Sequence, residues 1–293
     1  MALRLAIIAN PVAGRGHPFR KIQDYVRNWN HPNWDARLLT TQAPGHAGEL
    51  ARELAESPPD LLAVCGGDGT FNEVVSCLPQ PLFPLAILPC GTANVLAREL
   101  RLPLDPVKSL QIALKRNIRH VDVGVMRGGD NRSFMFVAGI GFDADAVYKA
   151  RPALKSAVGM AAYAVAVAEC LIGYKFPTFT LTANGRNYQA TSCLICNARS
   201  YGGGMVFCPE ADMTDGLLDV LVIEGIHRVG LAGFLLSAWC GVRRKHEWVQ
   251  RFRTKEIKIN GPSSVRIETD GELAGTLPAE FFLSEKTFPL VVP

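Results

Sequence analysis

The sequence lacks a hydrophobic run long enough to indicate a membrane-spanning helix. Its two longest apolar stretches are residues 157–174, which are rich in alanine and contain Glu169, and residues 229–242. The first is borderline in length and weakly hydrophobic, and the second is too short for a bilayer core of about 30 Å. We therefore expect both stretches to form helices of a globular protein.

The sequence also has little excess charge of either sign. It carries 31 basic and 27 acidic residues, for a formal net charge of +4, so no nucleic-acid partner is expected. Hydrophobic residues make up 48% of the chain and charged residues 20%, which argues against a disordered or fibrous protein. A length of 293 residues suggests about two domains.

Cysteine and histidine show no disulfide, zinc or hydrolase pattern. The eight cysteines are scattered, and the apolar run at residues 5–9 is too short for a secretory signal, so a reducing, cytoplasmic location is expected. Cys193 and Cys196 have C-x-x-C spacing but fall in an expected strand, where residues three apart point to opposite faces. The six histidines form no H-E-x-x-H motif and no Ser-His-Asp arrangement with a nucleophile elbow.

The first 120 residues or so alternate strand-like and helix-like segments, which predicts an α/β domain with a parallel sheet. After about residue 121 the sequence becomes rich in β-branched and aromatic runs, which predicts a β-rich second domain with hairpin turns at Asn184-Gly185 and Asp270-Gly271. We therefore expect domains at residues 1–122 and 123–293. The expected strands are 3–9, 36–40, 61–64, 85–88, 134–138, 179–182, 191–196, 218–223 and 265–269, and the expected helices are 18–29, 47–56, 71–78, 94–100, 155–174 and 229–239.

Three polar loops follow the first, third and fourth expected strands, at residues 10–14, 66–70 and 91–94. Ligands of parallel sheets lie beyond the carboxyl ends of the strands, where these loops would meet. Free N–H groups and the helix dipole at a strand-to-helix turn attract phosphate, and glycine lets it approach closely. One such loop alone could be a tight turn without a ligand, but three at one edge favour a phosphate site.

The sequence contains neither a Walker A loop nor a G-x-G-x-x-G fingerprint. Its loops instead resemble the nucleotide site of the diacylglycerol kinase catalytic-domain family, which includes sphingosine kinases and bacterial lipid kinases. The segments that carry this resemblance are NPVAG at 10–14, GGDGTFNEV at 66–74 and GTAN at 91–94, followed in the order of the bacterial branch by GIGFD at 139–143, YGGGM at 201–205, DGLLD at 215–219 and DGE at 270–272.

The resemblance implies an ATP-dependent lipid kinase that transfers the γ-phosphate of ATP to the hydroxyl of a membrane lipid. It implies an N-terminal α/β nucleotide-binding domain and a C-terminal β-sandwich domain that carries the lipid and the catalytic carboxylate. The implied nucleotide contacts are Asn10, Pro11, Val12, Ala13, Gly14, Thr41, Gly66, Gly67, Asp68, Gly69, Thr70, Phe71, Asn72 and Thr92.

The resemblance also implies roles for carboxylates and Mg²⁺. Asp68 would help to place the catalytic Mg²⁺, and Glu272 would be the general base, although the residues alone, without the resemblance, favour an ordinary solvated hairpin carboxylate there. A structural Mg²⁺ would bind the Asp215 carboxylate and the backbone carbonyls of Asp212 and Leu217, because Mg²⁺ prefers oxygen ligands, while Asp215 could also be a plain turn residue. Val95 stands where bacterial members often have an acid, which leaves the exact metal arrangement open.

The sequence says least about the molecule that accepts the phosphate. Residues 241–258 carry seven basic and two acidic residues, and could attract an anionic membrane surface, with Trp248 and Phe252 entering the interface. An ordinary solvated surface explains the run equally well. The rival functions are a kinase of a soluble acceptor, as in NAD kinases and phosphofructokinases, and a noncatalytic nucleotide- or lipid-sensing protein. The motifs after residue 120 favour the lipid kinase, whose lipid could be diacylglycerol, phosphatidylglycerol or a sphingoid base.

Overall fold

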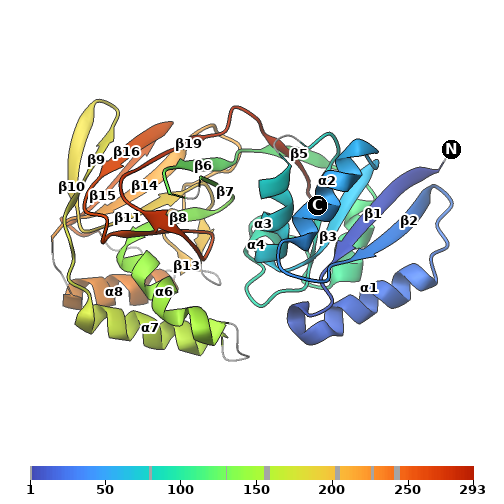
Figure 1. The fold of residues 1–293 in the computed structure, drawn as a ribbon, viewed down its shortest axis with the longest axis horizontal. Coiled ribbons are helices and arrows are strands. Elements are labelled where there is room, and N and C mark those ends of the chain that lie inside the picture. The colour runs from blue at the N-terminus through green and yellow to red at the C-terminus, as the bar shows by residue number, and fades with distance from the viewer. Residues whose placement is uncertain are drawn as a thin grey trace. The chain divides into compact units, whose positions relative to one another are not determined.

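The computed structural model describes residues 2–78, 81–129, 131–154, 159–201, 205–225, 228–240 and 245–293. The chain divides into two units, each with its own sheets and core (Figure 1). The N-terminal unit contains residues 1–121 and 286–293, and the C-terminal unit contains residues 122–285.

The N-terminal unit is built on a six-stranded sheet with the strand order β2-β1-β3-β4-β20-β5. All neighbours run parallel except β20 and β5. The residues of β3 and β4 are all buried, which is typical of a parallel sheet covered on both faces. The strands are β1 Leu3–Ala9, β2 Trp34–Thr40, β3 Leu61–Gly66, β4 Leu85–Pro89, β5 Ile118–Val121 and β20 Phe288–Val291.

In the described part of this unit, five α-helices and a short 3-10 turn connect the strands. α1 begins after Gly16, which has a positive φ of 75°, and has a proline in its first turn, as helix starts favour. The core of the unit contains Ile7, Ile22, Leu88 and Leu110. The connecting elements are η1 Ala13–Gly16, α1 His17–Arg27, α2 His46–Glu56, α3 Asp68–Cys77, α4 Val95–Glu99 and α5 Pro106–Ala113.

The last strand of the chain belongs to the N-terminal unit. β20 is paired with β4 and β5, and Figure 1 shows its red ribbon among the blue and green elements of this unit. Residues 286–293 therefore lie outside the second unit, whereas the sequence-based division assigned all of residues 123–293 to the second domain. The pairing is with strands more than 160 residues away, which no local pattern could indicate.

The C-terminal unit contains two six-stranded antiparallel sheets, ordered β10-β9-β16-β19-β6-β7 and β15-β14-β11-β8-β17-β18. Residues from both sheets, such as Phe134, Ile195, Val220 and Phe281, form one buried core, as in a β-sandwich. The strands are β6 Gly124–Arg127, β7 Arg132–Phe134, β8 Val137–Gly141, β9 Phe179–Ala183, β10 Arg186–Ala190, β11 Ser192–Cys196, β14 Leu218–Ile223, β15 Val249–Thr254, β16 Glu256–Asn260, β17 Arg266–Thr269, β18 Glu272–Thr276 and β19 Ala279–Leu283.

Among its described residues, this unit also contains three helices and a small two-stranded sheet. The helices are α6 Phe142–Leu154, α7 Gly159–Gly173 and α8 Arg228–Trp239, and the small sheet pairs β12 Ser200–Tyr201 with β13 Met205–Val206. Within the described parts of the chain, no helix combines the length and the apolar character needed to cross a bilayer.

The expected fold class is confirmed: a parallel α/β unit and an antiparallel β-rich unit. Both hairpin turns are also confirmed, because Asn184-Gly185 joins β9 to β10 and Asp270-Gly271 joins β17 to β18, all four with positive φ. The single strand expected at residues 134–138 is wrong, since β7 ends at Phe134 and β8 begins at Val137. Residues 155–158, 202–204 and 241–244 of the expected helices and motifs lie outside the described residues.

Candidate active site

The three glycine loops of the N-terminal unit meet at the carboxyl edge of its sheet. A Cβ atom on Gly91 would lie 2.7 Å from the Cα atom of Gly67, so these two loops touch backbone to backbone. A Cβ atom on Gly14, whose φ is +57°, would lie 2.4 Å from the carbonyl oxygen of Cys90. The first loop is further tied to α3 by a 3.2 Å hydrogen bond from Asn10 Nδ2 to Thr70 Oγ1. The three loops therefore form one continuous main-chain surface.

The loop after β4 is shaped by Asn94, which is buried and has a positive φ of 48°. Its Oδ1 atom accepts a hydrogen bond from Gly91 N, and its Nδ2 atom donates one to Gly91 O, both at 2.8 Å. Asn is one of the few side chains that adopt this backbone conformation readily. The amide of Asn94 thus fixes the main chain beside Gly67, where the sequence predicts a phosphate.

Asp68 lies at the start of α3, where its carboxylate links two of the loops. Its Oδ2 atom accepts a hydrogen bond from Val95 N at 3.0 Å, and its Oδ1 atom accepts one from Leu96 N at 3.1 Å. Asp68 therefore caps the N-terminus of α4, in addition to any role beside a phosphate. Val95 contributes its N–H group to this contact and buries its side chain, so position 95 supplies no acid here.

The remaining nucleotide residues from the sequence fall into three groups. Val12 and Thr92 are exposed at the loop tips. Phe71 is 1% exposed and packs in the core, so only its main chain faces the turn. Asn72 has a buried Oδ1 atom without a hydrogen-bond partner among the described residues, and Thr41 is buried next to β1, with its N–H donating to Ala9 O.

In the C-terminal unit, Glu272 is the first residue of β18 and follows the Asp270-Gly271 turn. Its side chain is 59% exposed, and its Oε2 atom lies 3.1 Å from Arg132 Nη1. An exposed ion pair of this kind contributes little to stability. The carboxylate is therefore accessible, with one guanidinium as its neighbour.

The turn that carries Glu272 is anchored by the preceding aspartate. The Asp270 carboxylate accepts hydrogen bonds from the N–H groups of Met135, Phe136 and Val137 at 2.7, 2.9 and 3.1 Å. These contacts hold the segment between β7 and β8 out of strand pairing, which explains why the expected strand at 134–138 is divided. Asp270 thus has a structural task, and the next acid along the chain, Glu272, is exposed and paired with Arg132.

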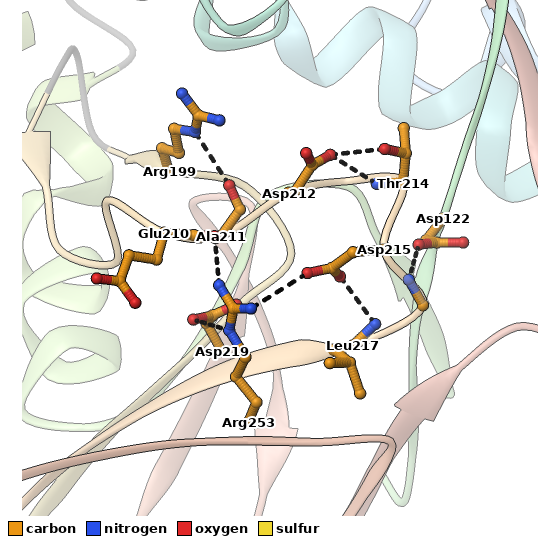
Figure 2. Close-up of polar contacts among 11 residues, drawn as sticks. Asp122, Arg199, Glu210, Ala211, Asp212, Thr214, Asp215, Leu217, Asp219 and Arg253 are labelled. Atoms are coloured by element: carbon orange, nitrogen blue, oxygen red, sulfur yellow. Dashed lines mark hydrogen bonds and ion pairs between the residues drawn. The ribbon is translucent and has the colours of Figure 1, made fainter.

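The predicted structural metal site lies in the loop that joins Asp212 to Leu217 (Figure 2). Asp215 Oδ1 accepts a hydrogen bond from Leu217 N at 3.0 Å, and Asp215 Oδ2 lies 3.7 Å from Arg253 Nη1. The backbone carbonyl of Asp212 accepts one from Asp215 N at 3.3 Å, while its carboxylate accepts from Thr214. The sequence-predicted ligand residues are therefore close together in one loop.

Asp122 is an acidic neighbour of this loop that sequence reasoning missed. Its Oδ2 atom accepts a hydrogen bond from Gly216 N at 2.9 Å (Figure 2). Burial raises the pKa of the Asp122 carboxyl, the Gly216 N–H opposes this, and the charges of Asp215 and Asp212 raise it further. The described residues contain no group of three or more His, Cys, Asp or Glu side chains arranged as metal ligands. Oxygen donors with an excess of negative charge nevertheless fit Mg²⁺.

Asp219, a second acidic neighbour of this loop, lies on β14 next to Arg253. Its Oδ1 atom accepts a hydrogen bond from Arg253 Nε at 3.1 Å. Burial raises the pKa of the Asp219 carboxyl, while the Arg253 guanidinium lowers it. Arg253 also donates from Nη2 to the backbone carbonyl of Glu210 at 2.6 Å, so it joins the loop to the sheet (Figure 2).

A pocket of about 470 Å³ lies in the C-terminal unit, lined by residues of β13, β14, β15 and α8 and by residues 207–210. Phe207 and Phe234 supply apolar walls, Lys245, Arg251 and Arg253 supply cations, and Glu210 and Asp219 supply carboxylates. Such a combination suits an amphiphile with an anionic group. No sequence motif pointed to this pocket.

The two aromatic residues expected at a membrane interface are packed inside this unit. The Phe252 ring stacks on Tyr188 at a centroid distance of 4.4 Å, and the Trp248 ring lies 4.7 Å from that of His246. Both side chains are partly buried, so their insertion into a membrane is not supported. The exposed cations Lys245, Arg251, Lys255 and Lys258 remain on the surface, while Arg243 and Arg244 lie outside the described residues.

The two units, a parallel α/β unit with glycine loops and an antiparallel β-rich unit, each match a known domain family. The chain belongs to the diacylglycerol kinase catalytic-domain family: residues 4–126 match the family described as "Diacylglycerol kinase catalytic domain". Residues 137–292 match the "YegS C-terminal NAD kinase beta sandwich-like domain". The resemblance seen in the motifs is thereby confirmed.

Relatives and solved structures agree with this family. The chain is 30% identical to a diacylglycerol kinase of Staphylococcus epidermidis, with 100% of this chain and 93% of that protein aligned, and 29% identical to one of Staphylococcus aureus over the same shares. A solved candidate diacylglycerol kinase of Bacillus anthracis shares the fold, with a TM-score of 0.82 at 24% identity over 99% of this chain and 95% of that one. An NAD kinase of Archaeoglobus fulgidus in complex with ATP has a TM-score of 0.54 at 12% identity over 99% and 93%.

Proposed function

We propose that the protein transfers the γ-phosphate of ATP to the hydroxyl group of a membrane lipid. One observation carries the proposal: three glycine loops meet backbone to backbone at the carboxyl edge of a parallel sheet, in a chain of the diacylglycerol kinase family. Phosphoryl transfer needs mainly positioning of the phosphates and neutralisation of their charge. Main-chain N–H groups at such an edge can provide both.

In this proposal the N-terminal unit holds ATP. The N–H groups of residues 66–70 and 91–92 bind its phosphates, with Asn10 to Gly14, Thr41, Phe71 and Asn72 completing the nucleotide site. Asp68, already fixed by Val95 N and Leu96 N, holds the catalytic Mg²⁺ with the phosphates. When bound, that ion neutralises phosphate charge. The residues of the chain bind and orient the donor.

Glu272 is the proposed general base. A base must reach the proton that it removes, and an exposed carboxylate at a firmly anchored turn meets this requirement. The lipid hydroxyl donates its hydrogen bond to Glu272. As the hydroxyl oxygen forms a bond to the γ-phosphorus, its proton moves to the Glu272 carboxylate, the bond from the γ-phosphorus to the β,γ-bridging oxygen breaks, and ADP leaves. Arg132, 3.1 Å away, keeps the carboxylate in place until the acceptor arrives.

The pocket of the C-terminal unit supports a lipid acceptor. Its phenylalanine walls suit an acyl chain, and Lys245 and Arg251 suit an anionic headgroup or interface. Because removing an acyl chain from a membrane costs about 0.8 kcal/mol per methylene, the enzyme would act at a membrane surface. The proposal therefore includes a cytoplasmic protein that associates peripherally with anionic lipid.

Incubation with labelled ATP and a panel of acceptors tests the function. The panel contains vesicles with diacylglycerol, phosphatidylglycerol or a sphingoid base, and NAD as a soluble acceptor, and the labelled product is identified by mass. We expect label in one lipid class and none in NAD. Labelled NAD with unlabelled lipids would establish the soluble-acceptor alternative, and binding of ATP without transfer to any acceptor would favour a noncatalytic sensor.

The structural Mg²⁺ at Asp215, Asp212 and Leu217 is a separate part of the proposal. An ion bound only by the folded state stabilises it by about 3 kcal/mol at a hundred times its dissociation constant, which corresponds to several degrees in the midpoint of thermal unfolding. We expect Mg²⁺ to raise this midpoint relative to chelator in the wild type but not in Asp215→Asn. Asp24→Asn, an exposed acid of α1, is the control. An equal Mg²⁺ effect in all three proteins would refute the site.

A further inference from the structure

Glu268 is a completely buried acid, with 0% exposure, two residues before the Asp270-Gly271 turn. It lies on β17, where Ile267 faces the sandwich core and the pairing with β18 shifts between Ile267 and Glu268. Because side chains alternate along a strand, Glu268 faces away from that core, toward the side covered by α6. A bulge at this position is a common means of redirecting a side chain.

One oxygen of Glu268 holds the turn. Its Oε2 atom accepts a hydrogen bond from Gly271 N at 2.7 Å. Gly271 has a φ of +85° and directly precedes Glu272. The turn is therefore held from two directions, by Glu268 through Gly271 N and by Asp270 through the three N–H groups of residues 135–137.

The other oxygen of Glu268 meets a second carboxyl group, that of Asp143 in the first turn of α6. A Cβ atom on Gly139 would lie 2.6 Å from Glu268 Oε1 and 2.3 Å from Asp143 Oδ2, so both oxygens converge over this glycine. Gly139 is also the register partner of Glu268 across β8 and β17. The missing side chain at position 139 thus makes the space in which the two acids meet.

Two ionised carboxylates cannot share such a space. Like charges in a buried site force one group to keep its proton, and Glu268 Oε1 has no N–H or O–H donor among the described residues. Burial and the Asp143 charge raise the pKa of the Glu268 carboxyl well above its usual range, against the lowering effect of the Gly271 N–H, while the nearby Asp270 charge raises it further.

We propose that Glu268 and Asp143 share one proton and that this pair is a positioning device, which holds Gly271 and through it the carboxylate of Glu272. The shared proton stands on the geometry alone, whereas the positioning role rests on the proposed function of Glu272. In this scheme Glu268 contacts neither ATP nor the lipid whose hydroxyl receives the phosphate. It acts by fixing where β18 begins.

Infrared difference spectroscopy tests the shared proton without reference to activity. Near neutral pH, the wild type should show the carbonyl stretch of a neutral carboxylic acid. Glu268→Gln and Asp143→Asn should each remove it, because one amide then supplies the hydrogen permanently. Absence of the band from the wild type, or its persistence in both variants, would overturn the shared proton. The shared proton would also be overturned if the band were absent and the purified protein retained a bound cation, because the cation would then neutralise the pair of carboxylates.

Steady-state kinetics tests the positioning role. Glu268→Gln keeps an acceptor for Gly271 N and a donor for Asp143, so we expect it to keep kcat within a few-fold. Glu268→Leu loses both contacts and should lower kcat about tenfold or more, since small displacements of a catalytic group are costly, with the KM for ATP within about twofold. Ile267→Val, on the core side of the same strand, controls for loss of stability.

The outcomes separate this inference from the proposed function. If the wild type is active and Glu268→Leu keeps wild-type kcat, or loses no more than Ile267→Val does at an equal folded fraction, the positioning role is wrong. Should Glu268→Leu fail to fold, a large loss of kcat in Glu268→Gln, with its melting behaviour unchanged, would contradict the role equally. If the wild type phosphorylates nothing, the proposed function fails, and the infrared result still decides the proton.

Discussion

The two units prepare for chemistry in opposite ways. In the N-terminal unit the proposed nucleotide site consists of main chain, and side chains such as Asn94 and Asp68 hydrogen-bond to that main chain. In the C-terminal unit main-chain N–H groups are spent on holding Asp270 and Glu268, and a side chain, Glu272, is left exposed. Activity that depends on main-chain amides should therefore be lowered most by a substitution that adds atoms beside them. Activity that depends on one carboxylate should be lowered most by a substitution that removes this carboxylate.

Removal of the exposed carboxylate should have the largest effect. We expect Glu272→Ala to lower kcat by about a hundredfold to ten-thousandfold, the usual contribution of a general base, in an assay of lipid phosphorylation. Glu280→Ala is the control, because Glu280 is also an acid of the C-terminal unit that is ion-paired on the surface, with Lys258 at 3.1 Å. Similar activity of both variants would remove Glu272 from the chemistry.

Asp68 tests whether the N-terminal unit relies on its main chain alone. If Asp68 contacts Mg²⁺, Asp68→Asn should lower kcat on the order of tenfold to a hundredfold while keeping one of its two acceptor atoms for α4. Asp105 also caps a helix, accepting hydrogen bonds from Val107 N and Lys108 N of α5 at 3.0 and 3.1 Å. Because Asn caps helices about as well as Asp, Asp105→Asn should cost less than about 1 kcal/mol of stability, and it controls for the change from acid to amide at a cap. Equal losses of activity and stability in both variants would make Asp68 a cap only.

An added methyl group tests the main-chain surface itself. Gly91→Ala would bring a Cβ atom to 2.7 Å from Gly67 Cα, a contact that requires the loops to separate. We expect the KM for ATP to rise several-fold or more with a smaller change in kcat. Gly233→Ala in α8, where a Cβ atom meets nothing within 4 Å, should be neutral or slightly stabilising. A normal KM in Gly91→Ala would show that the touching loops do not form the nucleotide site.

The sequence predicted the N-terminal unit better than the C-terminal one, for physical reasons. Strands buried on both faces appear as apolar runs, so β1 was placed at its observed bounds and β3 within two residues. The start of α3 was expected three residues late, because Asp68-Gly69-Thr70 has loop-like composition yet forms the first helical turn. The break before Val137 depends on Asp270, which is 133 residues away, and nonlocal contacts of this kind leave no local pattern.

The same limit applies to the candidate site. The glycine loops and the Asp-Gly-Glu turn are contiguous motifs, and they could be found without a structure. Arg132 and Asp122 were missed as site residues because each is an isolated polar residue that becomes relevant only through a partner far away in sequence. Arg253 was expected only as part of the basic run at residues 241–258, and its partner Asp219 lies 34 residues away. The pairing of Glu268 with Asp143 needed the register of β8 and β17 across Gly139. Sequence patterns reveal site residues that are contiguous in the chain. Residues that hold them in position come from distant segments, and strand pairing in the folded structure is needed to identify them.

The smallest expected effect concerns the pH dependence of stability, and it arises from the buried acid of the C-terminal unit, Glu268. Folding raises the pKa of Glu268, so the native state binds a proton that the unfolded state has lost above about pH 4 to 5. Stability should therefore fall as pH rises from about 5 toward the folded pKa. Glu268→Gln lacks this proton, so its midpoint of thermal unfolding should decline less as the pH rises. The difference in this midpoint between the variant and the wild type should grow with pH to a few degrees. Ile267→Val changes no titratable group and should leave the wild-type slope unchanged, and parallel curves for wild type and Glu268→Gln would contradict the raised pKa.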